Sequence, residues 1–226
     1  MMSFLMLTAE LTLLYFLSRW LIQSLYAFFL LIFKIRSIAI SLVTLLLFPG
    51  TVVHELSHLF VAEILGVRTG KLTLAPEEIR GTSIKAGSVA VAATDPIRRA
   101  LIGIAPVFTG IASLAALSYW LSSHSSFYEL IAMNYLLFAI SNSMFSSKED
   151  LKGFWPVAIT VSLIVAAGFF SGIRFGLTGQ AAIIVQQTIA SLVNSLAIVL
   201  AVNGILLLSL SISIVLVKKL INSSPA

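Results

Sequence analysis

Cysteine is absent from this 226-residue sequence, and charge is scarce, with only 14 basic and 9 acidic side chains. The absence of cysteine excludes disulfides, thiolate nucleophiles and cysteine-ligated metals. A soluble domain usually has about 25% charged residues, whereas this chain has 10%, together with 59% apolar residues. These proportions exclude a water-soluble globule. The net charge of +5 is too thinly spread along the chain for nucleic-acid binding, so we expect no nucleic-acid partner.

The apolar residues fall into stretches that suit bilayer crossings of about 20 residues each. We expect six membrane spans, at Leu11–Phe33, Ser37–Leu65, Ile97–Leu121, Phe127–Phe145, Phe154–Phe170 and within Ala181–Val217. The last stretch is too long for one upright span, so it predicts a long tilted helix, or an interfacial stretch before a single span, with a kink at Asn203-Gly204. The predicted fold class is an all-α polytopic membrane protein, a single integral-membrane domain over residues 1–226 with its motifs at about residues 37–153.

Basic residues are unevenly distributed between the two sides of this six-span arrangement. Ten of them share one side: Arg68, Lys71, Arg80, Lys85, Arg98, Arg99, Lys148, Lys152, Lys218 and Lys219. Lys34, Arg36 and Arg174 lie on the other side, and Arg19 lies within the first span. Since cytoplasmic loops carry the excess of Lys and Arg, we expect the first group and both termini to be cytoplasmic.

Three ionisable residues interrupt the second span, where charged groups are costly and usually functional. His54 and His58 are four residues apart, so on a helix they project from one face, one turn apart. Two imidazoles so placed can occupy two corners of a zinc tetrahedron. Glu55 points about 100° round the helix, where it can reach a metal-bound water and take its proton. This is the H-E-x-x-H pattern of zinc proteases, and the alternative is a histidine pair hydrogen-bonded within the bundle.

Zinc requires a third protein ligand, and depth in the membrane narrows the choice. His54 comes 17 residues after Ser37, about 26 Å along the span at 1.5 Å per residue, and therefore near the cytoplasmic surface. The fourth span ends at that same surface, directly before Glu149 and Asp150. Either carboxylate can serve as the third ligand. The alternative is that both belong to a solvated helix end beside the neighbouring lysines.

The motif and the segment after the fourth span resemble the site-2 protease family of intramembrane zinc metalloproteases, especially its small members without a PDZ domain. That family pairs H-E-x-x-H with an Asn-x-x-Pro…Asp-Gly segment at a later span, whose Asp is the third zinc ligand. Asn142 and Asp150 keep the family's eight-residue separation, which favours Asp150 over Glu149. The segment lacks the family's prolines and has Leu151 where glycine usually follows. The resemblance covers about Leu47–Gly153.

The loop between the second and third spans is rich in Gly, Thr, Ser and charge. Residues 72–74 and 88–92, with a turn around Gly81, predict a short β-hairpin-like cytoplasmic loop. Asp95 and Pro96 predict the N-cap and the first residue of the helix that follows. A strand edge beside a zinc site can hold a substrate as an added strand; the alternative is an ordinary connecting hairpin.

Together, the motif and the resemblance predict a zinc metalloendopeptidase that cleaves membrane-protein or membrane-associated peptide substrates near the cytoplasmic face of the bilayer. His54, His58 and Asp150 are expected to hold Zn²⁺, with Glu55 as general base and then as acid to the leaving amine. Asn142 is expected either to donate a hydrogen bond to the substrate or the developing oxyanion, or to bond a neighbouring helix.

Hydrolysis within the membrane also requires that water reach the site, and one feature of the sequence could allow this. Pro49-Gly50, just before the motif, is expected to loosen the helix there.

The alternative function comes from another class: a non-catalytic membrane protein, such as a transporter or pseudoprotease, with a structural metal site. A closed set of four ligands would indicate it, whereas an open coordination position indicates catalysis.

Overall fold

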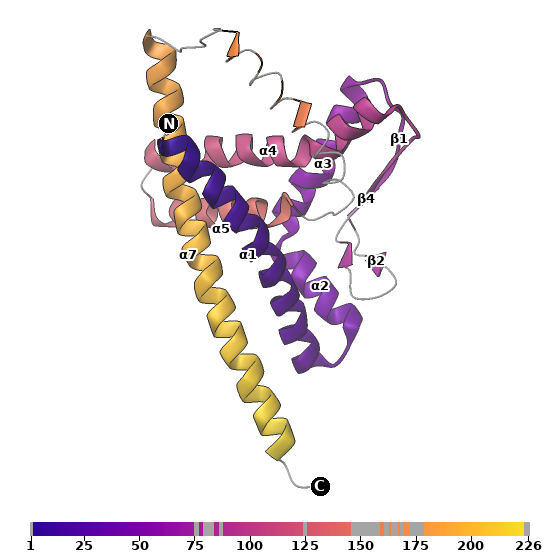
Figure 1. Cartoon of the computed structure of the whole chain (residues 1–226). Coiled ribbons are helices and arrows are strands. Elements are labelled where there is room, and N and C mark those ends of the chain that lie inside the picture. The colour runs from indigo at the N-terminus through magenta and orange to yellow at the C-terminus, as the bar shows by residue number, and fades with distance from the viewer. Residues whose placement is uncertain are drawn as a thin grey trace.

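The computed structural model of the chain is mostly helical (Figure 1). It describes residues 2–74, 77–78, 84–85, 88–123, 126–145, 159–160, 163, 167, 170–171 and 179–223. The helices α1 and α7 run alongside each other, while α4 and α5 lie crosswise to them (Figure 1). The helices α2 and α3, two small strand pairs and a few separate residues between 159 and 171 make up the rest of the described part of the chain.

The two outer helices, α1 (Met2–Phe33) and α7 (Gly179–Ser223), form the most extensive helix pairing in the described structure. Leucines from both helices fill two apolar cores, and Leu14, Leu21 and Leu196 are completely or almost completely buried. The helix α7 has 45 residues, about 68 Å at 1.5 Å per residue, and therefore more than twice the roughly 30 Å hydrocarbon core. It is continuous through Asn203-Gly204, where the sequence predicted a kink.

The predicted second span is two helices, α2 (Arg36–Leu46) and α3 (Phe48–Ile64), which meet at an angle of 78°. The break is at Leu47, whose dihedral angles of φ −102° and ψ 10° leave the helical region. Pro49 lies in the first turn of α3, where its missing N–H is not needed for the helical ladder. The Pro49-Gly50 pair was expected to loosen the helix, and the structure bends it just before that pair.

The crosswise layer contains α4 (Pro96–Ser123) and α5 (Phe127–Ser143). Asp95 is the N-cap that the sequence predicted: its Oδ1 accepts hydrogen bonds from the backbone N–H groups of Ile97 (3.1 Å) and Arg98 (3.0 Å). These bonds, with the one from Arg98 as the largest cause, lower the pKa of the Asp95 carboxyl. The prediction of a capped helix start at this position is confirmed.

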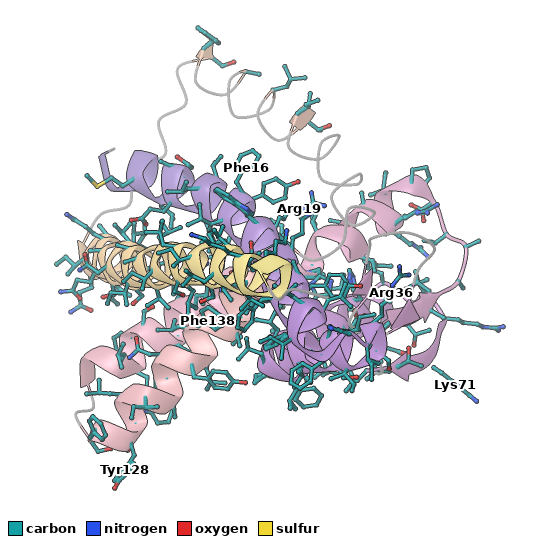
Figure 2. All side chains as sticks on the ribbon, turned by 90° about the horizontal axis from the view of Figure 1, so that it is seen from below. Phe16, Arg19, Arg36, Lys71, Tyr128 and Phe138 are labelled. Carbon is teal, nitrogen blue, oxygen red and sulfur yellow. The ribbon has the colours of Figure 1, made fainter. Side chains whose placement is uncertain are left out.

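Strands connect α3 to α4, as predicted. The strand β1 (Thr69–Thr73) pairs antiparallel with β4 (Ser88–Val91), and β2 (Glu77–Glu78) pairs with β3 (Ile84–Lys85). The predicted turn around Gly81 lies outside the described residues. Lys71 on β1 points away from the helices (Figure 2), so this strand pair leaves its basic side chain at the periphery of the molecule.

Three described helices are long and apolar enough to cross a membrane: Met6–Phe33, Pro96–Leu121 and Ala182–Lys219. The number becomes four if the bent α2–α3 pair is one span. The predicted fourth span forms α5, whose 17 residues are slightly fewer than the roughly 20 that a span needs. The predicted fifth span, 154–170, lies mostly outside the described residues. The chain therefore has membrane-protein character, while six spans and the orientation of the termini stay predictions.

Candidate metal centre

The residues of the H-E-x-x-H motif are buried, although all three are ionisable. The exposed fractions are 4% for His54, 5% for Glu55 and 8% for His58. They lie on α3 in the half of the broken span that follows the bend. Burial of ionisable groups is costly unless specific partners compensate for it, so this helical turn is the strongest candidate for a functional site in the described structure.

The two imidazoles lie together, as their four-residue spacing predicted. Their ring centroids are 4.9 Å apart, with the ring planes at 83° to each other. Each ring carries one nitrogen that can serve as a metal ligand when it is not protonated. The pair therefore offers two adjacent nitrogen donors from a single helical face.

A backbone carbonyl on the next helix fixes the orientation of one ring. The Nδ1 atom of His58 lies 2.8 Å from the carbonyl oxygen of Ile102 on α4. Because a carbonyl oxygen only accepts hydrogen bonds, Nδ1 donates in this contact, and Nε2 is the ring nitrogen that stays available to a metal. A histidine that binds a metal through one nitrogen usually donates its other N–H to such a partner. This contact fits the use of His58 as a metal ligand.

Small and hydroxylated side chains hold α3 against α4 beside the motif. The hydroxyls of Ser57 and Thr109 form a hydrogen bond between the two helices. Each hydroxyl also lies within hydrogen-bond distance of a carbonyl in its own helix, that of Val53 for Ser57 and that of Ala105 for Thr109. Since each hydroxyl has one proton, the one that donates across the helices does not donate to its own carbonyl at the same time. These paired contacts fix α4, and with it the Ile102 carbonyl, relative to the histidines.

The end of α5 lies close against α3, one turn before His54. A Cβ atom added at Gly50 would lie 2.1 Å from the carbonyl oxygen of Ala139 and 2.5 Å from Oγ of Ser143. A Cβ added at Gly110 of α4 would lie 2.9 Å from Cβ of Met144. Both glycines therefore permit a backbone approach that any larger residue would obstruct. Gly50 precedes His54 by four residues and so lies on the same helical face.

This contact places the beginning of the predicted ligand segment next to the motif. The described part of that segment ends at residue 145, and Glu149 and Asp150 lie outside the described residues. Asp150 is six residues beyond Met144, and six residues can span at most about 20 Å. The assignment of the third ligand to Asp150 therefore stays a prediction.

Asn142 forms hydrogen bonds with a neighbouring helix, which is one of the two roles that the sequence predicted for it. Its Nδ2 donates to Oδ1 of Asn203 on α7 (3.1 Å) and to the carbonyl of Phe138 (2.8 Å), and its Oδ1 accepts from Nδ2 of Asn203 (2.9 Å). Both amides are fully buried; Phe138 lies beside α7 in Figure 2. Since both N–H donors of Asn142 are in use, donation to a substrate requires one of these bonds to open. The substrate-binding role stays a prediction.

Two other side chains of a type that can bind zinc, Glu63 and His124, do not join the motif in the described structure. Glu63, nine residues after His54 in the sequence, accepts a hydrogen bond from the Thr69 hydroxyl at 3.0 Å and is exposed. His124 lies outside the described residues. Within the described ranges, no three His, Asp or Glu side chains come close enough together to hold a metal ion by themselves.

Sequence reasoning missed two partners of the site. Asn203 was interpreted as part of a kink, although a lone amide in an apolar stretch also predicts a polar partner on a neighbouring helix. The Ile102 carbonyl could not be found from sequence, because a backbone acceptor has no residue-type signal.

Comparisons with known proteins leave the family open: no family model, no curated protein and no solved structure matches this chain.

Proposed function

We propose that the chain is an intramembrane zinc metalloprotease that hydrolyses peptide bonds of membrane-associated substrates near the cytoplasmic face of the bilayer. The observation that carries the proposal is the buried His54–His58 pair, with Nδ1 of His58 directed at the Ile102 carbonyl. That bond occupies Nδ1 of His58 and leaves Nε2 as the nitrogen that can bind a metal. Glu55 in the same turn adds a carboxylate beside the pair.

The residues of the motif divide the chemistry among them. His54 and His58, with Asp150 from the segment after α5, would hold the metal. When bound, zinc supplies a Lewis acid that polarises a carbonyl group and allows water to attack near neutral pH. Glu55 accepts a proton from the attacking water and then donates it to the leaving amine nitrogen. A carboxylate can perform both steps because it regains its charge once the amine has left.

The bend between α2 and α3 supports access of water to this site. A continuous apolar helix would surround the motif with hydrocarbon, whereas the 78° break at Leu47 ends the first helix seven residues before His54. Irregular backbone at membrane depth is tolerated where it lines a protein interior or a water-filled cavity. The break therefore agrees better with a motif that is accessible to water than with a motif that is enclosed in lipid on all sides.

The function is tested with the Glu55→Gln variant in proteoliposomes. Glutamine keeps the size of the side chain but cannot take a proton, so hydrolysis of a membrane-anchored peptide should fall about 10²–10⁴-fold. Zinc content should stay at the wild-type level, since Glu55 is not assigned as a ligand. The matched control is Glu63→Gln, which changes the other glutamate of α3 and should leave both readouts unchanged. Full hydrolysis by Glu55→Gln would refute the proposal.

A further inference from the structure

An apolar groove runs between α3 and α4, on the motif side of the molecule. Its volume is about 240 Å³, and the surface that lines it is apolar throughout, from Val61, Ile64, Leu65, Leu101, Ile104, Ala105, Phe108 and Thr109. The spacing on α4, at positions 101, 104, 105 and 108, keeps these side chains on one helical face. Ile64 is 82% exposed and Phe108 is 63% exposed, so the groove is open toward the surroundings of the protein.

The two ends of the groove differ in chemistry. One end adjoins the Ser57–Thr109 hydrogen bond, which holds the helices together. The other end lies at the start of α4, where Arg98 precedes Leu101 by three residues and therefore shares its face. Arg98 is exposed, and its Nε lies 3.2 Å from Oδ2 of Asp95, an ion pair that involves one of its five N–H donors.

A second arginine lies at the same end. Arg68 follows Leu65 by three residues, is exposed, and accepts a hydrogen bond at its carbonyl from the N–H of Ala92 (3.0 Å). Val67, next to it, packs in one buried cluster with Ile102 of α4. The groove therefore extends from the Ser57–Thr109 pair to the end of the helices where Arg98 and the backbone of Arg68 lie.

We propose that this groove binds one acyl chain of an anionic phospholipid, with the phosphate group held by Arg98 and Arg68. The apolar lining matches hydrocarbon, and the two guanidinium groups complement the negative headgroup with paired N–H donors. Basic residues at the membrane surface attract anionic lipids of the cytoplasmic leaflet. The proposal does not depend on proteolytic activity.

The test measures lipid binding by native mass spectrometry of the purified full-length protein titrated with phosphatidylglycerol or phosphatidylcholine. The wild type should bind one phosphatidylglycerol more tightly than phosphatidylcholine. Arg98→Gln should weaken phosphatidylglycerol binding about tenfold, as expected for the loss of a charge-assisted hydrogen bond. The matched control is Arg99→Gln, which removes the same charge one residue along on another helical face and should have little effect.

Two further variants test the groove itself. Ala105→Trp should fill it and abolish the single tight site, while Ile205→Trp on the exposed face of α7 should not. Should Ala105→Trp fail to fold by size-exclusion chromatography and circular dichroism, Leu101→Gln makes the groove polar at a half-exposed position and should also weaken binding. Equal affinity for both lipids, equal effects of the two arginine variants, or unchanged binding in the folded groove variants would each overturn the proposal.

Discussion

At the scale of single residues, the buried motif is specified by contacts that involve backbone atoms. The Ile102 carbonyl sets the tautomer of His58, and the lack of a side chain at Gly50 lets α5 approach α3 one turn before His54. Sequence spacing could predict that the two imidazoles share a face. It could not predict these partners, because a carbonyl acceptor and a close helix approach depend on the tertiary arrangement.

Gly50 provides a residue-scale prediction. In Gly50→Ala the new Cβ would meet the Ala139 carbonyl, so α5 must move away from α3, and we expect a loss of about 1–3 kcal/mol of stability from overpacking. Zinc content should fall as well, because the segment after α5 moves with the helix. Both are measured on purified protein, by thermal unfolding and by metal analysis.

The matched control for this change is Gly204→Ala on α7, where a new Cβ meets nothing within 4 Å. Alanine has the higher helix propensity, so this control should be neutral or slightly stabilising. A Gly50→Ala protein as stable as the control, with full zinc content, would contradict the packing that is described for α3 and α5.

At the scale of elements, polar side chains fix how apolar helices pair. Leucines pack almost equally well in several registers, whereas the reciprocal Asn142–Asn203 bonds can form in only one register of α5 and α7. The sequence predicted a helix-bonding role for Asn142 but not its partner. It predicted the Asp95 cap and the strands on either side of the loop, because these depend on local residue chemistry.

The asparagine pair yields an element-scale prediction. In Asn203→Leu the amide of Asn142 loses a buried partner, which should cost about 1–3 kcal/mol of stability. The double variant Asn142→Leu/Asn203→Leu removes both amides and should be less destabilised than the two single changes added together. Unfolding midpoints in detergent provide the measurement.

Asn134→Leu is the appropriate control on α5, since Asn134 bonds only within its own helix, to the Leu130 carbonyl, among the described contacts. It should lower the midpoint less than Asn203→Leu does. Strictly additive effects in the double variant would show that the two amides do not stabilise each other.

At the scale of the whole molecule, composition predicted a membrane protein made of helices, and three long apolar helices agree with that. The count of six spans was not reproduced within the described residues. Two causes are physical: the predicted second span bends by 78° at Leu47, and α5, with 17 residues, is slightly shorter than the roughly 20 residues that a span needs. Hydropathy reports the length of an apolar stretch, but it does not report where packing bends a helix or how strongly the helix tilts.

The central claim also belongs to this scale, because it joins two segments almost a hundred residues apart in the sequence. The contacts of α5 with Gly50 and Gly110 bring the start of the predicted ligand segment to the motif. Whether the site forms depends on a carboxylate further along that segment. Zinc analysis of the purified protein therefore tests the account more directly than any assay of turnover.

The decisive measurement is the zinc content of Asp150→Ala compared with that of Glu149→Ala, with His54→Ala as the reference for a lost ligand. The account predicts one zinc per chain in the wild type and in Glu149→Ala, and loss of zinc in Asp150→Ala to the level of His54→Ala. Stoichiometric zinc in Asp150→Ala would contradict it.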